Sequence, residues 1–229
     1  MAGTNKELTE GTGRTVVLPT VVQALPGKPQ RPGARETQAF ARRVAEDPST
    51  WGHDEIAAVA SRFDILAESW DEERAGYRAA PLADALARGG PWPDGMCVEV
   101  GSGTGVLTPL LLERWAVTVC VDISAGMLAR ARAGLRVRAD ASRLPVRSGA
   151  AAAVVVGDAP LFGEEIGRVL GPHGVVIWVN ALGADAPYWV PVETIRDALG
   201  RSCAGPWSVV TSEALWGSWV VLRRETEDP

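Results

Sequence analysis

The stretch that decides the fold is Val98-Glu-Val-Gly-Ser-Gly-Thr-Gly105. A short apolar run, 96–100, leads into Gly101, Gly103 and Gly105, and a helix-like segment, 106–115, follows. A strand, a glycine-rich turn and a helix in this order form the cradle with which α/β proteins bind nucleotide-like ligands. Glycines permit tight turns and leave no Cβ between the backbone and a ligand. The stretch therefore predicts an α/β fold with a ligand at the end of this strand.

Two details of the glycine-rich stretch separate it from the dinucleotide fingerprint. That fingerprint requires glycine at its sixth position, where this chain has Val106. Glu99 stands two residues before the first glycine, where the strand of a dinucleotide-binding protein is usually apolar. A carboxylate at a strand end needs a partner that offsets its loss of hydration. Both details argue against a nicotinamide-dependent oxidoreductase.

The next two predicted strands also end in carboxylates. The apolar run 116–121 ends at Asp122, 17 residues after Gly105, and a carboxylate there can accept both hydroxyls of a ribose. Ser124 is a typical N-cap for the helix that follows. A third run, 135–139, ends at Asp140. Helix capping for Asp122 and an ordinary loop position for Asp140 are the alternative readings.

At this point the chain resembles the class I S-adenosylmethionine (SAM)-dependent methyltransferases, in the type 11 group that includes the ubiquinone and menaquinone methyltransferases. The similarity covers roughly residues 62–224 and rests on four motifs in the family's order. The resemblance implies SAM as cofactor. It also implies a Rossmann-like, doubly wound, mostly parallel seven-stranded sheet with an antiparallel C-terminal hairpin and an N-terminal helical cap. The motifs are Glu99–Gly105, Val121–Ser124 with Met127, Ala139–Ala141 with Leu144 and Pro145, and Arg168–Gly174.

The resemblance also assigns roles to individual residues. The implied partner of Glu99 is the amino group of the ligand's methionine part. Trp70 stands where relatives usually have a tyrosine that closes over the sulfonium, and it offers a cation–π contact; a core tryptophan is the alternative. The residues expected to bind SAM are Trp70, Glu99, Gly101, Ser102, Gly103, Gly105, Asp122, Ile123, Met127, Asp140, Ala141 and Asp158.

Catalytic and substrate-binding residues are less well defined by the sequence. Asp158, after the fourth strand, and His53, in the cap region, are the candidate catalytic residues, with helix capping and a surface position as their alternatives. A turn is expected at Gly171–Gly174, and His173 within it is expected to lie far from the ligand. Only six residues, 158–163, separate the fourth strand from the next helix, so the substrate side differs from that of relatives. Substrate-lining residues are predicted to be Tyr77, Asn180, Tyr188, Trp189 and Trp216.

The chain divides into two parts. Residues 1–50 are rich in glycine and proline and form an N-terminal extension that is partly extended or disordered. Helical spacing appears at 35–45, and Pro19, Pro26, Pro29 and Pro32 exclude a helix before residue 34. Residues 51–229 form the methyltransferase domain, with a cap at 53–89 made of two helices that Pro81 is expected to interrupt.

Composition and net charge limit the classes of partner that this protein can be expected to bind. The net charge of -5 disfavours nucleic acid and anionic membranes, and no apolar run reaches the roughly 20 residues of a membrane span. The three cysteines are unpatterned, which favours reduced core residues in a cytoplasmic protein and no metal site. The expected partner is a small molecule, and a homodimer is left open.

Three functions follow from these patterns. The favoured one is transfer of a methyl group from SAM to oxygen, nitrogen or carbon of a small aromatic or apolar metabolite, because tryptophan is abundant near the predicted substrate side. The second is a SAM-binding protein without methyl transfer, either regulatory or a partner subunit. The third is the oxidoreductase disfavoured above.

Overall fold

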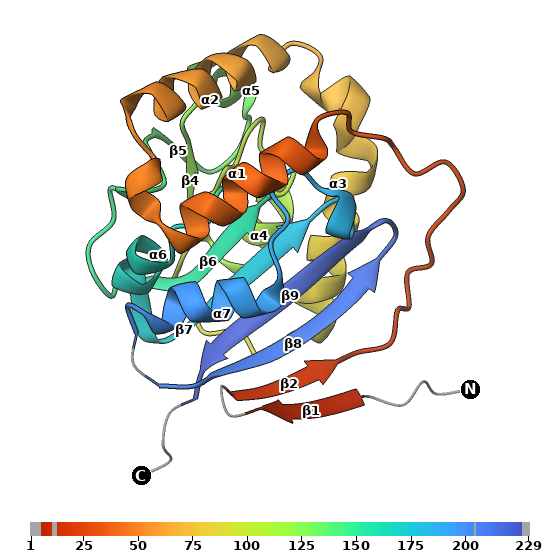
Figure 1. The fold of residues 1–229 in the computed structure, drawn as a ribbon, viewed down its shortest axis with the longest axis vertical. Helices are drawn as coiled ribbons and strands as arrows, with labels where there is room; N and C mark the ends of the chain where they lie inside the picture. Colours follow the sequence, from red (N-terminus) through yellow and green to blue (C-terminus); the bar gives the residue numbers. More distant parts are fainter. Residues whose placement is uncertain (1–5, 11–12, 204, 226–229) are drawn as a thin grey trace.

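The computed structural model describes residues 6–10, 13–203 and 205–225. All its strands join one sheet (Figure 1). The strands are β1 Lys6–Glu10, β2 Gly13–Val17, β3 Met96–Val100, β4 Val117–Asp122, β5 Leu135–Arg138, β6 Ala151–Gly157, β7 Leu170–Asn180, β8 Trp207–Ala214 and β9 Gly217–Arg224. Their order across the nine-stranded sheet is β1-β2-β8-β9-β7-β6-β3-β4-β5.

The seven strands expected from the sequence are all present. Strands β3 to β7 are all parallel to one another. Strand β9 lies between β7 and β8 and is antiparallel to both. This is the doubly wound sheet with a C-terminal hairpin that the motifs predicted. The sheet exceeds the predicted seven strands because β1 and β2, from the N-terminal extension, continue it beyond β8.

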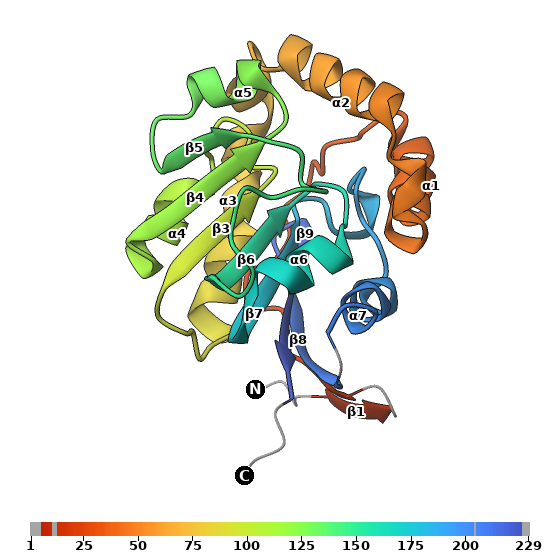
Figure 2. The ribbon, with the colours of Figure 1, turned by 90° about the vertical axis from the view of Figure 1, so that its left-hand side faces the viewer.

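Helices cover both faces of the sheet (Figure 2). Helices α1, α6 and α7 pack on one face, and α3 and α4 pack on the other. Strand alternation decides which residue faces which layer: Val98 and Val100 of β3 belong to the first core, and Cys97 belongs to the second. The helices are α1 Ala34–Glu46, α2 His53–Leu66, α3 Trp70–Arg88, α4 Thr108–Arg114, α5 Ala125–Arg130, α6 Gly163–Val169 and α7 Val192–Gly200, with short 3₁₀ turns at Pro48–Thr50 and Gly183–Asp185.

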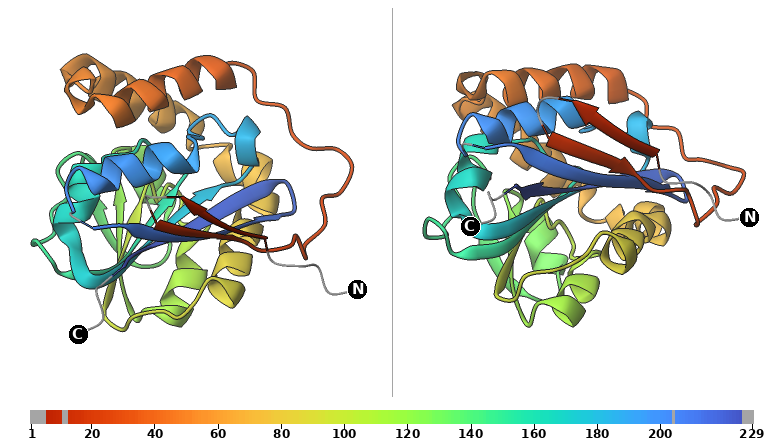
Figure 3. Two further views of the ribbon diagram at one scale, coloured as in Figure 1. Left: turned by 60° about the horizontal axis from the view of Figure 1, so that its bottom comes forward. Right: turned by 90° about the horizontal axis from the view of Figure 1, so that it is seen from below.

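The described part of the N-terminal extension is held against the core. Strand β2 pairs in parallel with β8, and the bridge between Val22 and Ala214 continues this contact. The chain then rises along the molecule to α1, which packs against α7 (Figure 3). The extended form predicted for this segment is therefore observed from residue 13 onward, and residues 1–5 and 11–12 lie outside the described part. The division at residue 50 stays a prediction.

Two local expectations need correction. Helix α3 runs without interruption through Pro81, which the sequence had suggested as a break. Proline removes one backbone hydrogen bond, and packing offsets that loss here, because Pro81 is buried and a Cβ on Gly217 would meet its ring at 2.4 Å. The expected turn at Gly171–Gly174 is part of β7, where the pairing with β6 shifts register.

Helix α2 and the first part of α3 lie across the end of the sheet at which the parallel strands finish (Figure 1), and the rest of α3 packs on the sheet face. They thus form the cap that the sequence predicted between residues 53 and 89. Within the described residues, no helix has the length and apolar character needed to cross a membrane.

Candidate functional site

A cavity of about 630 Å³ lies beneath the cap, at the carboxyl ends of β3, β4, β5 and β6. Strand order reverses between β3 and β6, and α/β proteins bind ligands at such switch points. We call this space the first cavity.

The glycine loop forms one wall of the first cavity. Gly101 and Gly103 line it with φ of +70° and +57°, the left-handed region that glycine adopts readily. A Cβ built on Gly103 would meet only Met127 Sδ at 3.9 Å and Trp70 Nε1 at 4.0 Å, so it would project into the open space. Ser102 and Gly105 belong to the same turn but do not line the cavity. Their predicted role is therefore limited to shaping the loop.

Asp122 lies at the end of β4 with its carboxylate at the cavity wall. Oδ2 accepts the Gly103 N–H at 2.7 Å and Oδ1 accepts the Ser124 N–H at 2.8 Å. Burial raises the pKa of this carboxyl, and the backbone hydrogen bonds oppose the rise. A carboxylate offers about four acceptor positions, so these backbone donors leave capacity for a ribose hydroxyl. Ser124 caps α5 as expected, with its hydroxyl accepting the Met127 N–H at 3.1 Å.

Asp140 and Ala141, after β5, line the far end of the cavity beside Ile123. Asp140 accepts the Ser142 N–H at 2.9 Å and the indole N–H of Trp51 at 3.0 Å. Trp51 precedes the cap and was not predicted as a site residue. A ligand that hydrogen-bonds to Asp140 must share this carboxylate with Trp51.

Glu99 is placed differently from its predicted role. Strand alternation turns its side chain toward α4, where it is 1% exposed, and it does not line the cavity. Oε2 accepts the Thr108 hydroxyl at 2.7 Å, and Oε1 has no hydrogen-bond partner among the described residues. Burial raises the pKa of Glu99 to about 7. Thr108 thus partners one oxygen of Glu99, and the contact with a bound methionine group stays a prediction.

Side-chain hydrogen bonds tie the cap, and Trp51 just before it, to the loops after β3, β4 and β5. Besides the bond from Trp51 to Asp140, Asp64 of α2 accepts from the Ser124 hydroxyl at 2.5 Å and from the Gly126 N–H at 2.8 Å. Asp71 of α3 accepts the Thr104 hydroxyl at 2.5 Å. These contacts hold α2 and α3 over the cavity, as a lid requires.

Aromatic side chains form the roof of the first cavity. Trp70 lies edge-on to Phe63, with ring centroids 5.6 Å apart. The Arg78 guanidinium is 5.1 Å from the Trp70 ring, eight residues along the same helix. Tyr188 is buried opposite, and burial raises its pKa to about 12. Trp70 therefore stands at the predicted position, with Arg78 already stacked on its ring.

Asp158 follows β6 and lines the cavity in a left-handed conformation with φ of +49°. Its Oδ1 accepts from Asn180 Nδ2 at 3.0 Å, and its Oδ2 accepts the Ala181 N–H at 3.3 Å and pairs with Arg78 at 3.1 Å. Non-glycine residues adopt this conformation when the surrounding structure enforces it, often at functional sites. Asn180, predicted to contact substrate, is instead buried and positions Asp158.

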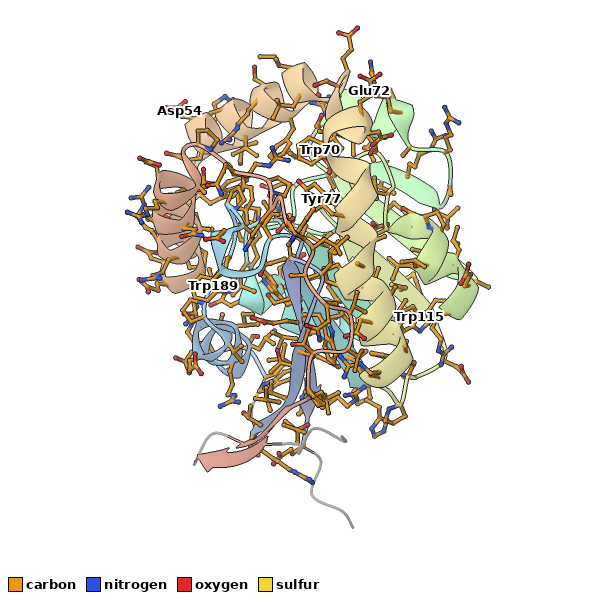
Figure 4. All side chains as sticks on the ribbon, turned by 90° about the vertical axis from the view of Figure 1, so that its right-hand side faces the viewer. Asp54, Trp70, Glu72, Tyr77, Trp115 and Trp189 are labelled. Carbon is orange, nitrogen blue, oxygen red and sulfur yellow. The ribbon has the colours of Figure 1, made fainter. Side chains whose placement is uncertain are left out.

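A second cavity, about 530 Å³, adjoins the first and shares Phe63, Trp70, Arg78, Asp158 and Tyr188 with it. Tyr77 lines it, in agreement with the prediction for that residue. Figure 4 shows Trp70 and Tyr77 one above the other along α3. The lining includes Arg31, which the N-terminal segment brings in, and Arg62 of α2; neither was predicted.

Three predicted residues lie outside both cavities. His53 is the exposed first residue of α2 and lines neither cavity. Trp216 stands behind Tyr77, with ring centroids 5.8 Å apart, and donates its indole N–H to the Leu25 carbonyl at 2.6 Å. Trp189 packs behind the same wall and lies away from Tyr77, near α7 (Figure 4). Both tryptophans support the wall from behind.

Among the described residues, no group of three or more His, Cys, Asp or Glu side chains is placed to hold a metal ion. Cys97, Cys120 and Cys203 are buried free thiols.

Comparison with known proteins shows which family the glycine-loop region is similar to. Residues 98–178 match the family described as "Methyltransferase domain". A search of curated protein sequences found no match.

The fold is shared with solved methyltransferase structures. The DhpI complex with S-adenosylhomocysteine (SAH) matches with a TM-score of 0.59 at 19% identity over 77% of this chain and 100% of that chain. A SAM-dependent methyltransferase from Aquifex aeolicus matches with a TM-score of 0.56 at 14% identity over 71% and 98% of the two chains. A Haloferax volcanii protein solved with the Trm112 methyltransferase activator matches with a TM-score of 0.56 at 19% identity over 72% and 98%. Residues 98–178 therefore match a methyltransferase domain, and the chain has the fold of the SAM-dependent methyltransferases.

Proposed function

We propose that this protein transfers a methyl group from SAM to a small metabolite, with the cofactor in the first cavity and the acceptor in the second. The observation that carries the proposal is the position of Asp122, whose carboxylate lies at the cavity wall beside the glycine loop. The two cavities share Trp70 and Asp158, so a ligand in one would touch a ligand in the other.

The residues of the first cavity fit the parts of SAM. Asp122 would hold the ribose, and Ile123, Asp140 and Ala141 would surround the adenine. Gly101 and Gly103 leave room for the methionine part, since their backbone approaches the cavity without a Cβ. Trp70 and Met127 would enclose the region near the sulfonium.

SAM supplies an activated methyl group, so the protein's task is to align the acceptor and exclude water. The cap serves that purpose, since its three hydrogen-bonded ties close α2 and α3 over the cavities. The oxygens of Asp158 already accept hydrogen bonds from Asn180 and Ala181 and pair with Arg78. We assign Asp158 the role of orienting Arg78.

Replacing Asp122 by alanine is expected to weaken SAM binding by about ten- to a hundredfold, since hydrogen bonds to a charged group contribute roughly 1.5–3 kcal/mol. Isothermal titration calorimetry with SAM measures the effect. Asp47→Ala is the matched control, because Asp47 also caps a helical turn but lies outside the cavity. An unchanged dissociation constant in folded Asp122→Ala protein would remove the ribose assignment.

Replacing Trp70 by alanine is expected to weaken SAM binding about tenfold and to slow methyl transfer, because it opens the roof and frees Arg78. Trp92→Ala is the comparison: Trp92 packs on Trp115 away from both cavities. That variant should lose stability and keep SAM affinity. Equal losses of affinity in the two variants would show that the Trp70 effect is a general loss of stability.

A methyl-donor turnover assay over a metabolite panel separates this proposal from a SAM-binding protein without methyl transfer. Binding of SAM without turnover on any acceptor would favour that second function, which the short segment 158–163 also accommodates.

A further inference from the structure

The second cavity carries an excess of positive charge. Arg31, Arg62 and Arg78 line it, and Asp158 is the one acidic residue among its described lining residues. These arginines come from three separate segments: the chain before α1, helix α2 and helix α3. The fold thus gathers three cations around one apolar pocket.

The arginines differ in how their charge is balanced. Arg78 pairs with Asp158 at 3.1 Å, and the two side chains are 13% and 10% exposed. Arg31 donates to the neutral Tyr77 hydroxyl at 2.5 Å, which orients the guanidinium without neutralising it. Arg62 is exposed and has no acidic partner within the described residues. The pocket therefore holds about two positive charges that the protein does not compensate.

A sulfonium in the first cavity would add another positive charge at the boundary that both cavities share. A protonated amine in the second cavity would be repelled by the arginines and by the sulfonium. An anionic acceptor would be attracted by all of them. Guanidinium groups bind carboxylates and phosphonates especially well, because their planar N–H donors match two oxygens.

The second cavity also lacks a suitable base. Neither histidine lines either cavity within the described part of the chain, and Asp158 is occupied by hydrogen-bond donors. A general base is needed only when the nucleophile carries a proton. An oxyanion carries none at neutral pH, so it suits a site built in this way.

We propose that the acceptor is the oxyanion of a small organic acid with an aromatic or apolar body, held by Arg31, Arg62 and Arg78 and methylated on oxygen. This inference rests on the proposed function. In the reaction an oxygen lone pair forms the O–CH₃ bond, the S–CH₃ bond breaks with its electron pair going to sulfur, and no proton moves. One positive and one negative charge disappear together, which a water-poor pocket favours.

The first test is binding to the full-length protein saturated with SAH, measured by calorimetry. Four probes share a benzyl group: phenylacetate, benzylphosphonate, neutral phenylacetamide and cationic 2-phenylethylamine. We expect at least one anion to bind about tenfold or more tightly than the amide and the amine, with affinity that falls as salt is added. Tighter phenylacetate would indicate a carboxylic acid, and tighter benzylphosphonate a phosphonic or phosphoric acid.

The second test uses matched arginine variants. Arg62→Gln and Arg31→Gln should each weaken the preferred anion about three- to tenfold and leave the amide unchanged. Arg42→Gln is the control, because Arg42 is exposed on α1 and lines neither cavity. SAH affinity should remain at the wild-type value in all three variants.

Three results would overturn the inference: the amide binding as tightly as both anions, the amine binding most tightly, or neither anion binding up to about 10 mM. Turnover gives a further check for a carboxylic acid, since its methyl ester releases methanol in alkali, whereas a methylated amine or ring carbon does not. If these tests contradict an anionic acceptor while SAH binds normally, the proposed function is unaffected. Failure of SAH to bind would instead contradict the proposed function itself.

Discussion

The Gly103→Val protein is expected to fold and to show no SAM binding that calorimetry can detect. The Cβ position of Gly103 faces the open cavity between Trp70 and Met127, with no other atom within 3.9 Å. A valine there places a branched side chain in the space where the ligand approaches the backbone. Circular dichroism tests whether the fold is kept, because the new side chain meets solvent-filled space and no packed core.

The strain of the substitution needs its own control. Gly103 has φ of +57°, and a side chain in this conformation costs roughly 1–2 kcal/mol. Gly149, in the turn before β6, has φ of +69° and nothing within 4 Å of its Cβ position. Gly149→Val should therefore lose a similar amount of stability and bind SAM normally. SAM binding to Gly103→Val at wild-type strength would mean that the ligand lies elsewhere.

The parts of this site that the sequence predicted are those that strand ends determine. In a parallel sheet the carboxyl ends of neighbouring strands meet at one edge, so Gly101, Asp122 and Asp140 had to come together once their strands were recognised. The capping role of Ser124 could also be predicted from the sequence, because it involves a hydrogen bond between residues only three positions apart.

The unpredicted residues owe their positions to contacts between distant segments. Arg31 reaches the second cavity because the N-terminal segment pairs with β8 and then crosses to α1. Trp51 reaches Asp140, 89 residues away in sequence, through the cap. No local pattern encodes such placements. Two tryptophans show the opposite error. Trp189 and Trp216 follow strand ends, which suggested contact with substrate, yet they pack behind the wall of the second cavity.

Glu99 shows how strand alternation can redirect a motif residue. Its place before the glycine loop suggested a ligand contact, but the side chain points to the α4 layer and meets Thr108. Side chains alternate between the faces of a strand, so its neighbours Val98 and Val100 face the opposite core. The position in the motif is therefore compatible with a structural role, and this role has a measurable consequence.

Wild-type stability is expected to fall as the pH rises from about 5 to 8, because of Glu99. Burial raises its pKa in the folded protein to about 7, from an ordinary value of 4.5. Between these two values the folded state binds more protons than the unfolded state, so the free energy of unfolding decreases with rising pH. Glutamine at position 99 cannot ionise and lacks this decrease. Glu99→Gln should therefore gain about 2–3 kcal/mol relative to wild type between pH 5 and pH 8.

Urea unfolding of both proteins at the two pH values measures this gain, and the difference between variant and wild type cancels the other titrating groups. Glu113→Gln, an exposed substitution on α4 with the same change of charge, should show no such gain. SAM titration of Glu99→Gln then decides between the two roles of this residue. An unchanged dissociation constant is the expected result, because Glu99 is walled off from the first cavity. A loss of tenfold or more would restore the contact with the methionine amino group, because removal of a charge that the ligand does not touch should change its affinity less.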